Sequence, residues 1–156
     1  MKRRVVLTSF AGAFAAWSLP TSAQPALPPV QVFKNANCGC CAAWVAHMKD
    51  AGFGVTVVEV DDTTVARRKY GLPDRFGSCH TAVVAGYVVE GHVPATDVKK
   101  LLAMKPVATG VAVPGMPVGS PGMEVGSRKD PYQVLLIDKQ GRARVFSDYS
   151  QARSSS

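Results

Sequence analysis

The sequence contains 156 residues, four of them cysteines, and has a formal net charge of +7. Three of the basic residues stand at positions 2–4, so the chain that follows residue 23 keeps a net charge of only +4. The remaining basic run, Arg67-Arg68-Lys69, is typical of the solvated face of an amphipathic helix. The composition therefore predicts one small domain with its own core and argues against nucleic acid as a partner.

The first 23 residues have the pattern of a signal peptide. Three basic residues precede an apolar run from 5 to 19, and small residues end the segment at Ala23. The run is shorter than the roughly 20 residues that a membrane-spanning helix needs, so we expect cleavage after Ala23 and no membrane span in the mature chain. General secretion to the periplasm is the simplest prediction, and the paired arginines are also compatible with twin-arginine export.

Between residues 30 and 104 the spacing of apolar residues predicts alternating strands and helices. Short β-branched runs bounded by Gly, Pro or Asn indicate strands, whereas apolar residues three or four apart, with a cap such as Asp62, indicate helices. The predicted strands are 30–34, 54–61, 82–85 and 87–90, and the predicted helices are 42–51, 63–70 and 95–104. The order is therefore β-α-β-α-β-β-α, preceded by a Pro-rich arm at 24–29.

This α/β order, with a Cys-x-x-Cys motif before the first helix, resembles the thioredoxin fold. In that fold, the loop before the third strand lies against the cysteine-bearing helix and usually carries a cis-proline. The corresponding loop here, residues 78–81, contains Cys79 and His80, so the resemblance places a thiol and an imidazole opposite the motif. The third thiol inside the motif, Cys40, and the lack of a proline in the loop are departures that replace redox-tuning features with metal ligands.

The composition changes at 105–131, where proline and glycine dominate and the step Pro-Gly-Met occurs twice. A loop of this length in a compact domain is usually functional or disordered. The thioethers of Met116 and Met123 are soft donors suited to Cu(I), although the two side chains could equally pin the loop onto the core.

Residues 132–146 have the pattern of a β-hairpin, with a polar turn at 139–141. We expect this hairpin to add strands to the edge of the sheet. The thioredoxin-like domain is therefore predicted to extend over 30–149, with a polar tail at 150–156.

The thiols of Cys38, Cys40 and Cys41 stand where a strand gives way to the first turn of a helix. Unpaired N–H groups at a helix N-terminus favour the thiolate, which is the form that attacks disulfides and binds soft metals. A disulfide framework is the simpler alternative in an exported protein, but neighbouring cysteines form strained or very small rings that stabilise the fold little. The pattern indicates a thiol site, either metal-binding or redox, and Cys79 adds a fourth sulfur.

Several soft thiolates close together are typical of Cu(I), Zn(II) or iron–sulfur sites. A structural zinc site generally combines two Cys-x-x-Cys pairs, or one pair with two histidines. Here the second half is Cys79-His80 alone, so zinc is the weaker prediction. The methionines and the expected export favour copper, and bridging sulfurs would allow more than one Cu(I) ion.

The three histidines differ in what their positions predict. His80 is adjacent to Cys79, which favours a role as a metal ligand or as the partner of one. His92 fits a turn-capping or surface role as well as it fits ligation. His47 stands two turns further along the helix than Cys40, about 10 Å away, so its predicted role is structural.

Four motifs together resemble the exported CopG-type copper-resistance proteins, a family long described only as a domain of unknown function. They are Cys-Gly-Cys-Cys at 38–41, Gly-Ser-Cys-His-Thr at 77–81, Glu-Gly-His-Val-Pro at 90–94 and the Pro-Gly-Met repeats at 113–124. The resemblance implies a thioredoxin-like domain that binds copper, encoded near other copper-handling genes whose periplasmic products are candidate partners. Carried over by position, it implies the metal ligands Cys38, Cys40, Cys41 and Cys79, with His80, Met116 and Met123 at further motif positions.

Two functions of different classes remain open. As a metal-binding protein, the molecule would hold Cu(I) for sequestration, for transfer or for a change of oxidation state. As an enzyme, it would be a thiol–disulfide oxidoreductase with Cys38 as the attacking thiolate and Cys41 as the resolving thiol. Cys40 argues against simple exchange, because a third adjacent thiol can trap the mixed disulfide.

Overall fold

The computed structural model describes residues 26–150. The predicted signal peptide at 1–23, the start of the arm at 24–29 and all but the first residue of the tail at 150–156 lie outside the described residues. Among the helices of the described range, none has the length and hydropathy of a membrane span.

The described chain has a mixed α/β fold with seven strands, three α-helices and one short 3-10 helix. In chain order the elements are β1 (Val30–Lys34), α1 (Gly39–Asp50), β2 (Val55–Glu59), α2 (Thr63–Lys69), η1 (Asp74–Phe76), β3 (His80–Val84), β4 (Tyr87–Glu90), α3 (Ala95–Met104), β5 (Gly110–Ala112), β6 (Gln133–Ile137) and β7 (Ala143–Asp148). The predicted succession of strands and helices is present. The first helix begins at Gly39 rather than at residue 42, so Cys40 and Cys41 belong to its first turn.

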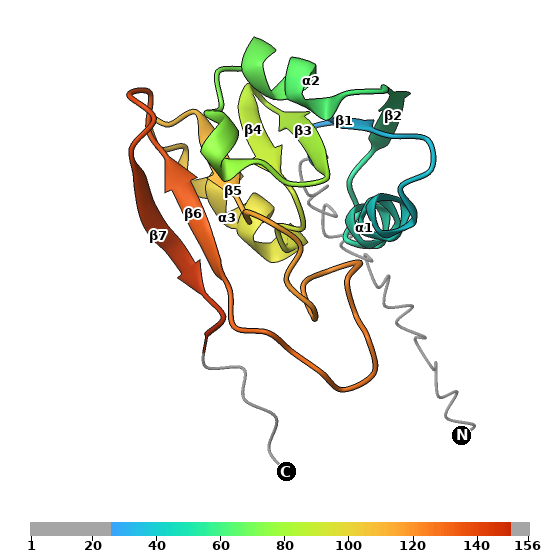
Figure 1. The fold of residues 1–156 in the computed structure, drawn as a ribbon. Coiled ribbons are helices and arrows are strands. Elements are labelled where there is room, and N and C mark those ends of the chain that lie inside the picture. The colour runs from blue at the N-terminus through green and yellow to red at the C-terminus, as the bar shows by residue number, and fades with distance from the viewer. Residues whose placement is uncertain (1–25, 151–156) are drawn as a thin grey trace, which may run out of the picture.

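The strands form one sheet in the order β2-β1-β3-β4-β5-β6-β7 (Figure 1). β1 pairs parallel with β2 and antiparallel with β3, and β3 pairs antiparallel with β4. β5 pairs parallel with β4 and antiparallel with β6. The closing hairpin of β6 and β7 therefore extends the sheet as expected, but it does so through β5, which the sequence pattern does not predict.

Helices cover both faces of the sheet. α1 and α3 pack on one face, where Trp44, Met48 and Leu101 are fully buried, and the segment from α2 to η1 covers the other face with Leu72 and Phe76. Burial of each such side chain contributes on the order of 2 kcal/mol to stability. Trp44 and Met48 stand four residues apart, so the apolar spacing that predicts the first helix also marks its packed face.

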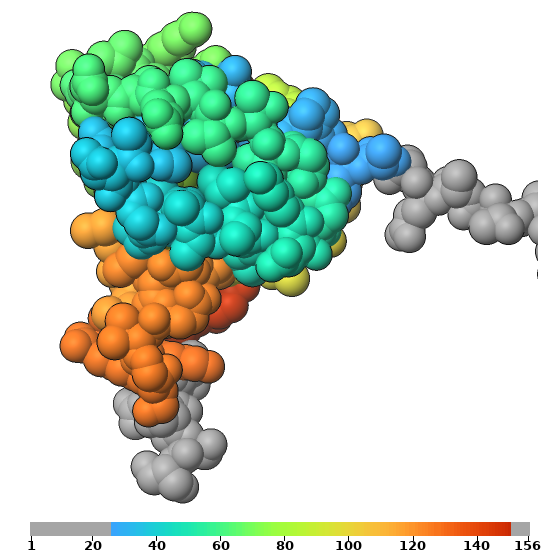
Figure 2. All heavy atoms as spheres, turned by 90° about the vertical axis from the view of Figure 1, so that its right-hand side faces the viewer, coloured from blue at the N-terminus to red at the C-terminus, as the bar shows by residue number. Residues whose placement is uncertain are grey.

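Three segments meet at one end of the sheet. The pairing of Lys34 with His80 and of Thr81 with Glu90 places the ends of β1 and β4 beside the start of β3. The cysteine motif follows β1, and Cys79 immediately precedes β3. The loop between β5 and β6 returns to the same end, and Figure 2 shows its orange surface directly against the cyan surface of α1.

Candidate metal centre

The cysteine motif surrounds the N-terminus of α1. Cys38 is the N-cap residue of the helix, and Cys40 and Cys41 lie in its first turn. Cys38 and Cys41 are joined by a disulfide, whereas Cys40 and Cys79 are free. The sulfur of Cys40 is 3.4 Å from that of Cys38. A bridge between residues only three apart restricts the unfolded chain little, which fits a reactive site better than a structural cross-link.

Cys79 brings the fourth sulfur to the motif from a different part of the chain. The sulfurs of all four cysteines lie within 4.8 Å of one another. The backbone carbonyl of Cys79 also lies 3.7 Å from the sulfur of Cys41, across 38 residues of sequence. The structure thus brings together all four cysteines that the sequence singled out.

Two histidines form a second group of donors around Cys79. Its sulfur is 3.4 Å from Nδ1 of His80 and 3.0 Å from Nε2 of His92. Both imidazoles are fully buried. Nε2 of His80 has no hydrogen-bond partner among the described residues, which leaves one buried donor or acceptor unused. Cys79 therefore belongs to both groups, and ligand atoms of the second group also lie within 4.8 Å of one another.

The burial of His92 excludes the surface role that the sequence left open. Its position follows from the β3–β4 hairpin, in which Thr81 pairs with Glu90. When this antiparallel register is continued by two residues on each side, residue 92 lies opposite residue 79. The two-residue turn at 85–86 fixes that register. This register was the signal in the sequence that could have identified His92.

Burial sets the protonation states of these groups in the metal-free protein. It lowers the pKa of His80 to about 3 and also lowers the pKa of His92, so both imidazoles are neutral and able to bind a metal. Burial, reinforced by the neighbouring Cys40, raises the pKa of Cys79 to about 12. A metal that binds Cys79 therefore has to displace a proton.

His47 stands apart from this centre. Its Nε2 accepts a hydrogen bond of 3.0 Å from the backbone N–H of Ala95, at the first turn of α3. Burial lowers its pKa, so the neutral form that can accept this bond is favoured. The contact agrees with the structural role expected from its spacing to Cys40.

The loop at 113–132 lies over α1 and is held there by backbone contacts. The carbonyl of Pro121 is 2.8 Å from Nδ1 of His92. Gly122 packs so closely on α1 that an added Cβ would lie 2.7 Å from the nitrogen of Trp44. Met116 is 54% exposed, and Met123 is half-buried next to Gly122. The loop reaches the cysteine segments through its backbone, and ligation by either thioether stays a prediction.

A buried ion pair lies behind the Cys79 segment and was missed at the level of sequence. Arg67 was expected on a solvated face, which is wrong: it is only 6% exposed, because its guanidinium pairs with the fully buried carboxylate of Glu90. Arg68, the next residue, is exposed as predicted.

The donor set suits a soft metal ion. Once the disulfide is reduced, four thiol sulfurs and two neutral imidazoles converge from three segments of the chain. Sulfur-rich sites of this kind select Cu(I), Zn(II) or iron–sulfur clusters over hard cations, which prefer oxygen ligands.

Comparison with known proteins gives two results. A family model described as "Protein of unknown function, DUF411" matches residues 76–123, a stretch that contains Cys79, both buried histidines and the two methionines of the loop. Two solved structures, described as forms 1 and 2 of the copper resistance protein CopG, are each 46% identical to this chain with a TM-score of 0.75. Each alignment covers 79% of this chain and 98% of the other. No curated protein sequence gives a significant match.

Proposed function

Because the chain belongs to the CopG-type copper-resistance family, we propose that it binds copper as Cu(I) through the thiolates of Cys38, Cys40, Cys41 and Cys79. The observation that carries the proposal is the convergence of four sulfurs within 4.8 Å. Thiolates are the soft ligands that Cu(I) prefers, and sulfurs this close can bridge metal ions. One or more Cu(I) ions are therefore expected, with zinc a weaker occupant.

Copper binding through all four sulfurs needs the reduced protein. Two electrons and two protons convert the Cys38–Cys41 disulfide into two thiols, and these lose their protons when the metal binds. His80, Met116 and Met123 are proposed as additional ligands, and the geometry adds His92. Two observations support metal ligation by the imidazoles. Nε2 of His80 has no hydrogen-bond partner among the described residues, and Nε2 of His92 lies 3.0 Å from the sulfur of Cys79.

We propose that the protein acts in copper resistance after export to the periplasm, by sequestering copper, passing it on or changing its oxidation state. The signal-peptide pattern at 1–23 supports export, and other periplasmic copper-handling proteins are the proposed partners. A thioredoxin-like core is proposed for 30–104. The strand order β2-β1-β3-β4, with a cysteine motif at the start of α1, supports that assignment.

A thiol–disulfide oxidoreductase is the second candidate, favoured by the disulfide itself. Cys38 is partly exposed at the N-cap of α1, as an attacking sulfur needs to be, and Cys41 is buried one turn further on, as suits a resolving thiol. Oxidation of two thiols to this disulfide would release two electrons and two protons to a substrate disulfide, which becomes two thiols.

Elemental analysis of anaerobically reduced residues 24–156 tests the proposal. The protein is loaded with Cu(I) in competition with a chelator of known affinity, beside a Cys79→Ser variant and beside a sample offered Zn(II). Tight copper binding that is lost in Cys79→Ser would support one site built from both cysteine segments. No retained copper, with four free thiols still titratable, would favour the oxidoreductase.

A further inference from the structure

A buried ion pair connects α2 to the end of β4 beneath the candidate centre. Nε and Nη2 of Arg67 lie 2.9 and 2.8 Å from Oε1 of Glu90. Glu90 is fully buried, and Arg67 is nearly so. Two charges removed from water in this way need further hydrogen bonds to offset the cost of desolvation.

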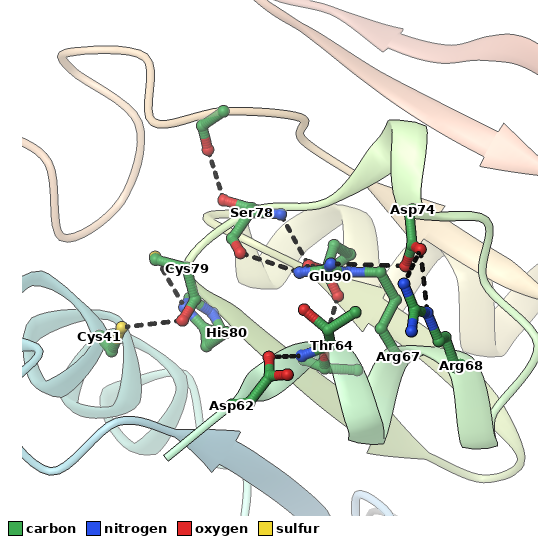
Figure 3. Close-up of polar contacts among 12 residues, drawn as sticks. Cys41, Asp62, Thr64, Arg67, Arg68, Asp74, Ser78, Cys79, His80 and Glu90 are labelled. Atoms are coloured by element: carbon green, nitrogen blue, oxygen red, sulfur yellow. Dashed lines mark hydrogen bonds and ion pairs between the residues drawn. The ribbon is translucent and has the colours of Figure 1, made fainter. Parts of the chain in front are cut away.

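Those further hydrogen bonds go to the residues around Cys79 (Figure 3). The backbone N–H of Ser78 donates to Oε1 of Glu90 at 2.7 Å, and Nη2 of Arg67 donates to the backbone carbonyl of Ser78 at 3.0 Å. The hydroxyl of Thr81 donates to Oε2 of Glu90 at 2.7 Å. The pair therefore holds the chain on both sides of Cys79.

We propose that Arg67 and Glu90 are positioning residues that hold the sulfur of Cys79 against the cysteine motif and the buried imidazoles. The metal part of this inference rests on the proposed function. Because both backbone polar groups of Ser78 are engaged, the peptide that leads into Cys79 has little freedom to rotate. Cys79 is the only one of the four cysteines outside the motif, so its placement decides whether the fourth sulfur is available.

The guanidinium of Arg67 suits these contacts better than a lysine ammonium would. A planar guanidinium can reach a carboxylate and a carbonyl at once, whereas a lysine ammonium acts as a point charge on a shorter reach. The fit is also tight, because a Cβ added to Gly77 would lie 2.7 Å from Cζ of Arg67. The hydroxyl of Ser78 donates to the carbonyl of Gly115, so the same segment also holds the loop that carries Met116.

A buried ion pair such as this one is weak evidence for a role in stability. Buried ion pairs can often be replaced by apolar residues of similar volume with no loss of stability. The neighbouring pair on the same helix, Arg68 with Asp74, is exposed, and Arg68 makes no hydrogen bond to Ser78 or Cys79. Asp74 approaches the buried pair only at 3.8 Å from Nη1 of Arg67. Arg68 is therefore a matched control for the loss of an arginine from α2.

The test measures how readily the thiol of Cys79 is alkylated, in the full mature chain without metal. A Cys40→Ser background with the Cys38–Cys41 disulfide intact leaves Cys79 as the single free thiol. We expect the double variant Arg67→Met, Glu90→Leu to raise the iodoacetamide alkylation rate of Cys79 by about tenfold, because the segment opens more often. Arg68→Met should leave the rate unchanged, and Arg67→Lys should give an intermediate rate.

Two further measurements separate positioning from general loosening of the fold. In a Cys79→Ser background, where Cys40 is the free thiol, the double variant should leave the alkylation rate of Cys40 unchanged. With all cysteines present and reduced, it should weaken Cu(I) binding by about 10-fold to 100-fold, as losing a support of a metal ligand typically does.

An unchanged alkylation rate of Cys79 in the double variant would overturn the inference, as would an equal rise for Cys40. If the double variant does not fold, Arg67→Lys decides alone, since a rate equal to the parent's would overturn the inference. Failure of the parent to bind Cu(I), with the alkylation difference intact, would contradict the proposed function and leave the positioning role standing.

Discussion

The sulfur of Cys79 lies 3.0 Å from Nε2 of His92, directly across the β3–β4 hairpin. The two residues occupy the pairing position two steps beyond Thr81 and Glu90. Both turn residues, 85 and 86, have positive φ, as the tight two-residue turn of a hairpin requires. The backbone register of the hairpin therefore brings the thiol and the imidazole together.

Replacing His92 with alanine is expected to weaken Cu(I) binding by about tenfold or more, because the nearest imidazole to Cys79 is lost. Competition with a Cu(I) chelator measures the change. His47→Ala is the matched control. It removes the bond from Ala95, so the free energy of unfolding should fall by about 1 kcal/mol while copper affinity stays at the parent value. Parent-like copper affinity in His92→Ala would remove His92 from the site.

Cys40→Pro should weaken copper binding while it leaves disulfide exchange at Cys38 and Cys41 intact. Cys40 is the second residue of α1, where a backbone N–H has no intrahelical acceptor, so proline is tolerated there. Chelator competition and the reduction of a small disulfide substrate measure the two properties on one sample. Copper bound at the parent stoichiometry and affinity would show that four thiols are not needed.

Gly122→Ala is expected to displace the loop at 113–132 from α1. The added Cβ would lie 2.7 Å from the nitrogen of Trp44 and 2.9 Å from the carbonyl of Cys40, at a φ of +84°. Faster transfer of Cu(I) to a chelator should follow, because the cover over the site is loosened. Gly126→Ala is the control, since Gly126 also has positive φ but open space around it. Equal transfer rates in both variants would mean that backbone strain alone is responsible.

The copper-free protein should lose stability as the pH falls below about 6.5. Burial holds the pKa of His80 at about 3, so the unfolded chain takes up a proton that the folded state does not. Proton uptake therefore favours unfolding increasingly from pH 6.5 downward. Urea unfolding at pH 7.5, 6 and 5 should give decreasing free energies, with a smaller decrease in His80→Asn. If the free energy of unfolding fell equally with pH in that variant, the loss of stability would come from other titratable groups.

The strands and helices up to residue 104 were predictable because their apolar spacing is regular and bounded by caps and glycines. β1 and α3 have the predicted bounds. β5 has no such pattern, because it is a run of three residues inside a Pro- and Gly-rich stretch. It forms because Gly110 permits an approach to the carbonyl of Val88 that any Cβ would block. Such a contact is visible only once the sheet is assembled.

The cysteines of the site were predictable from their spacing and from the order of elements, and the supporting residues were not. Arg67 stands in a run of basic residues, which is normally a solvated pattern. Its burial depends on Glu90, which stands 23 positions away. Nothing in the sequence around Glu90 indicates that its carboxylate is buried. The gathering of the four sulfurs follows from the spacing of the motif and the order of the elements, whereas the burial of the charges behind them depends on side-chain packing that neither pattern records.

The distances in sequence between the parts of the site also set the order in which it can be completed during synthesis. Cys79 follows Cys41 by 38 residues, and Pro121 follows His92 by a further 29. A chain made from its N-terminus therefore exposes the cysteine motif well before its partners exist. The bridge found in the structure joins Cys38 to Cys41, only three residues apart, so it needs no segment made later. After export to an oxidising compartment, early formation of that bridge would keep both sulfurs from mispairing with Cys79, and the bridge would have to be reduced before copper is loaded.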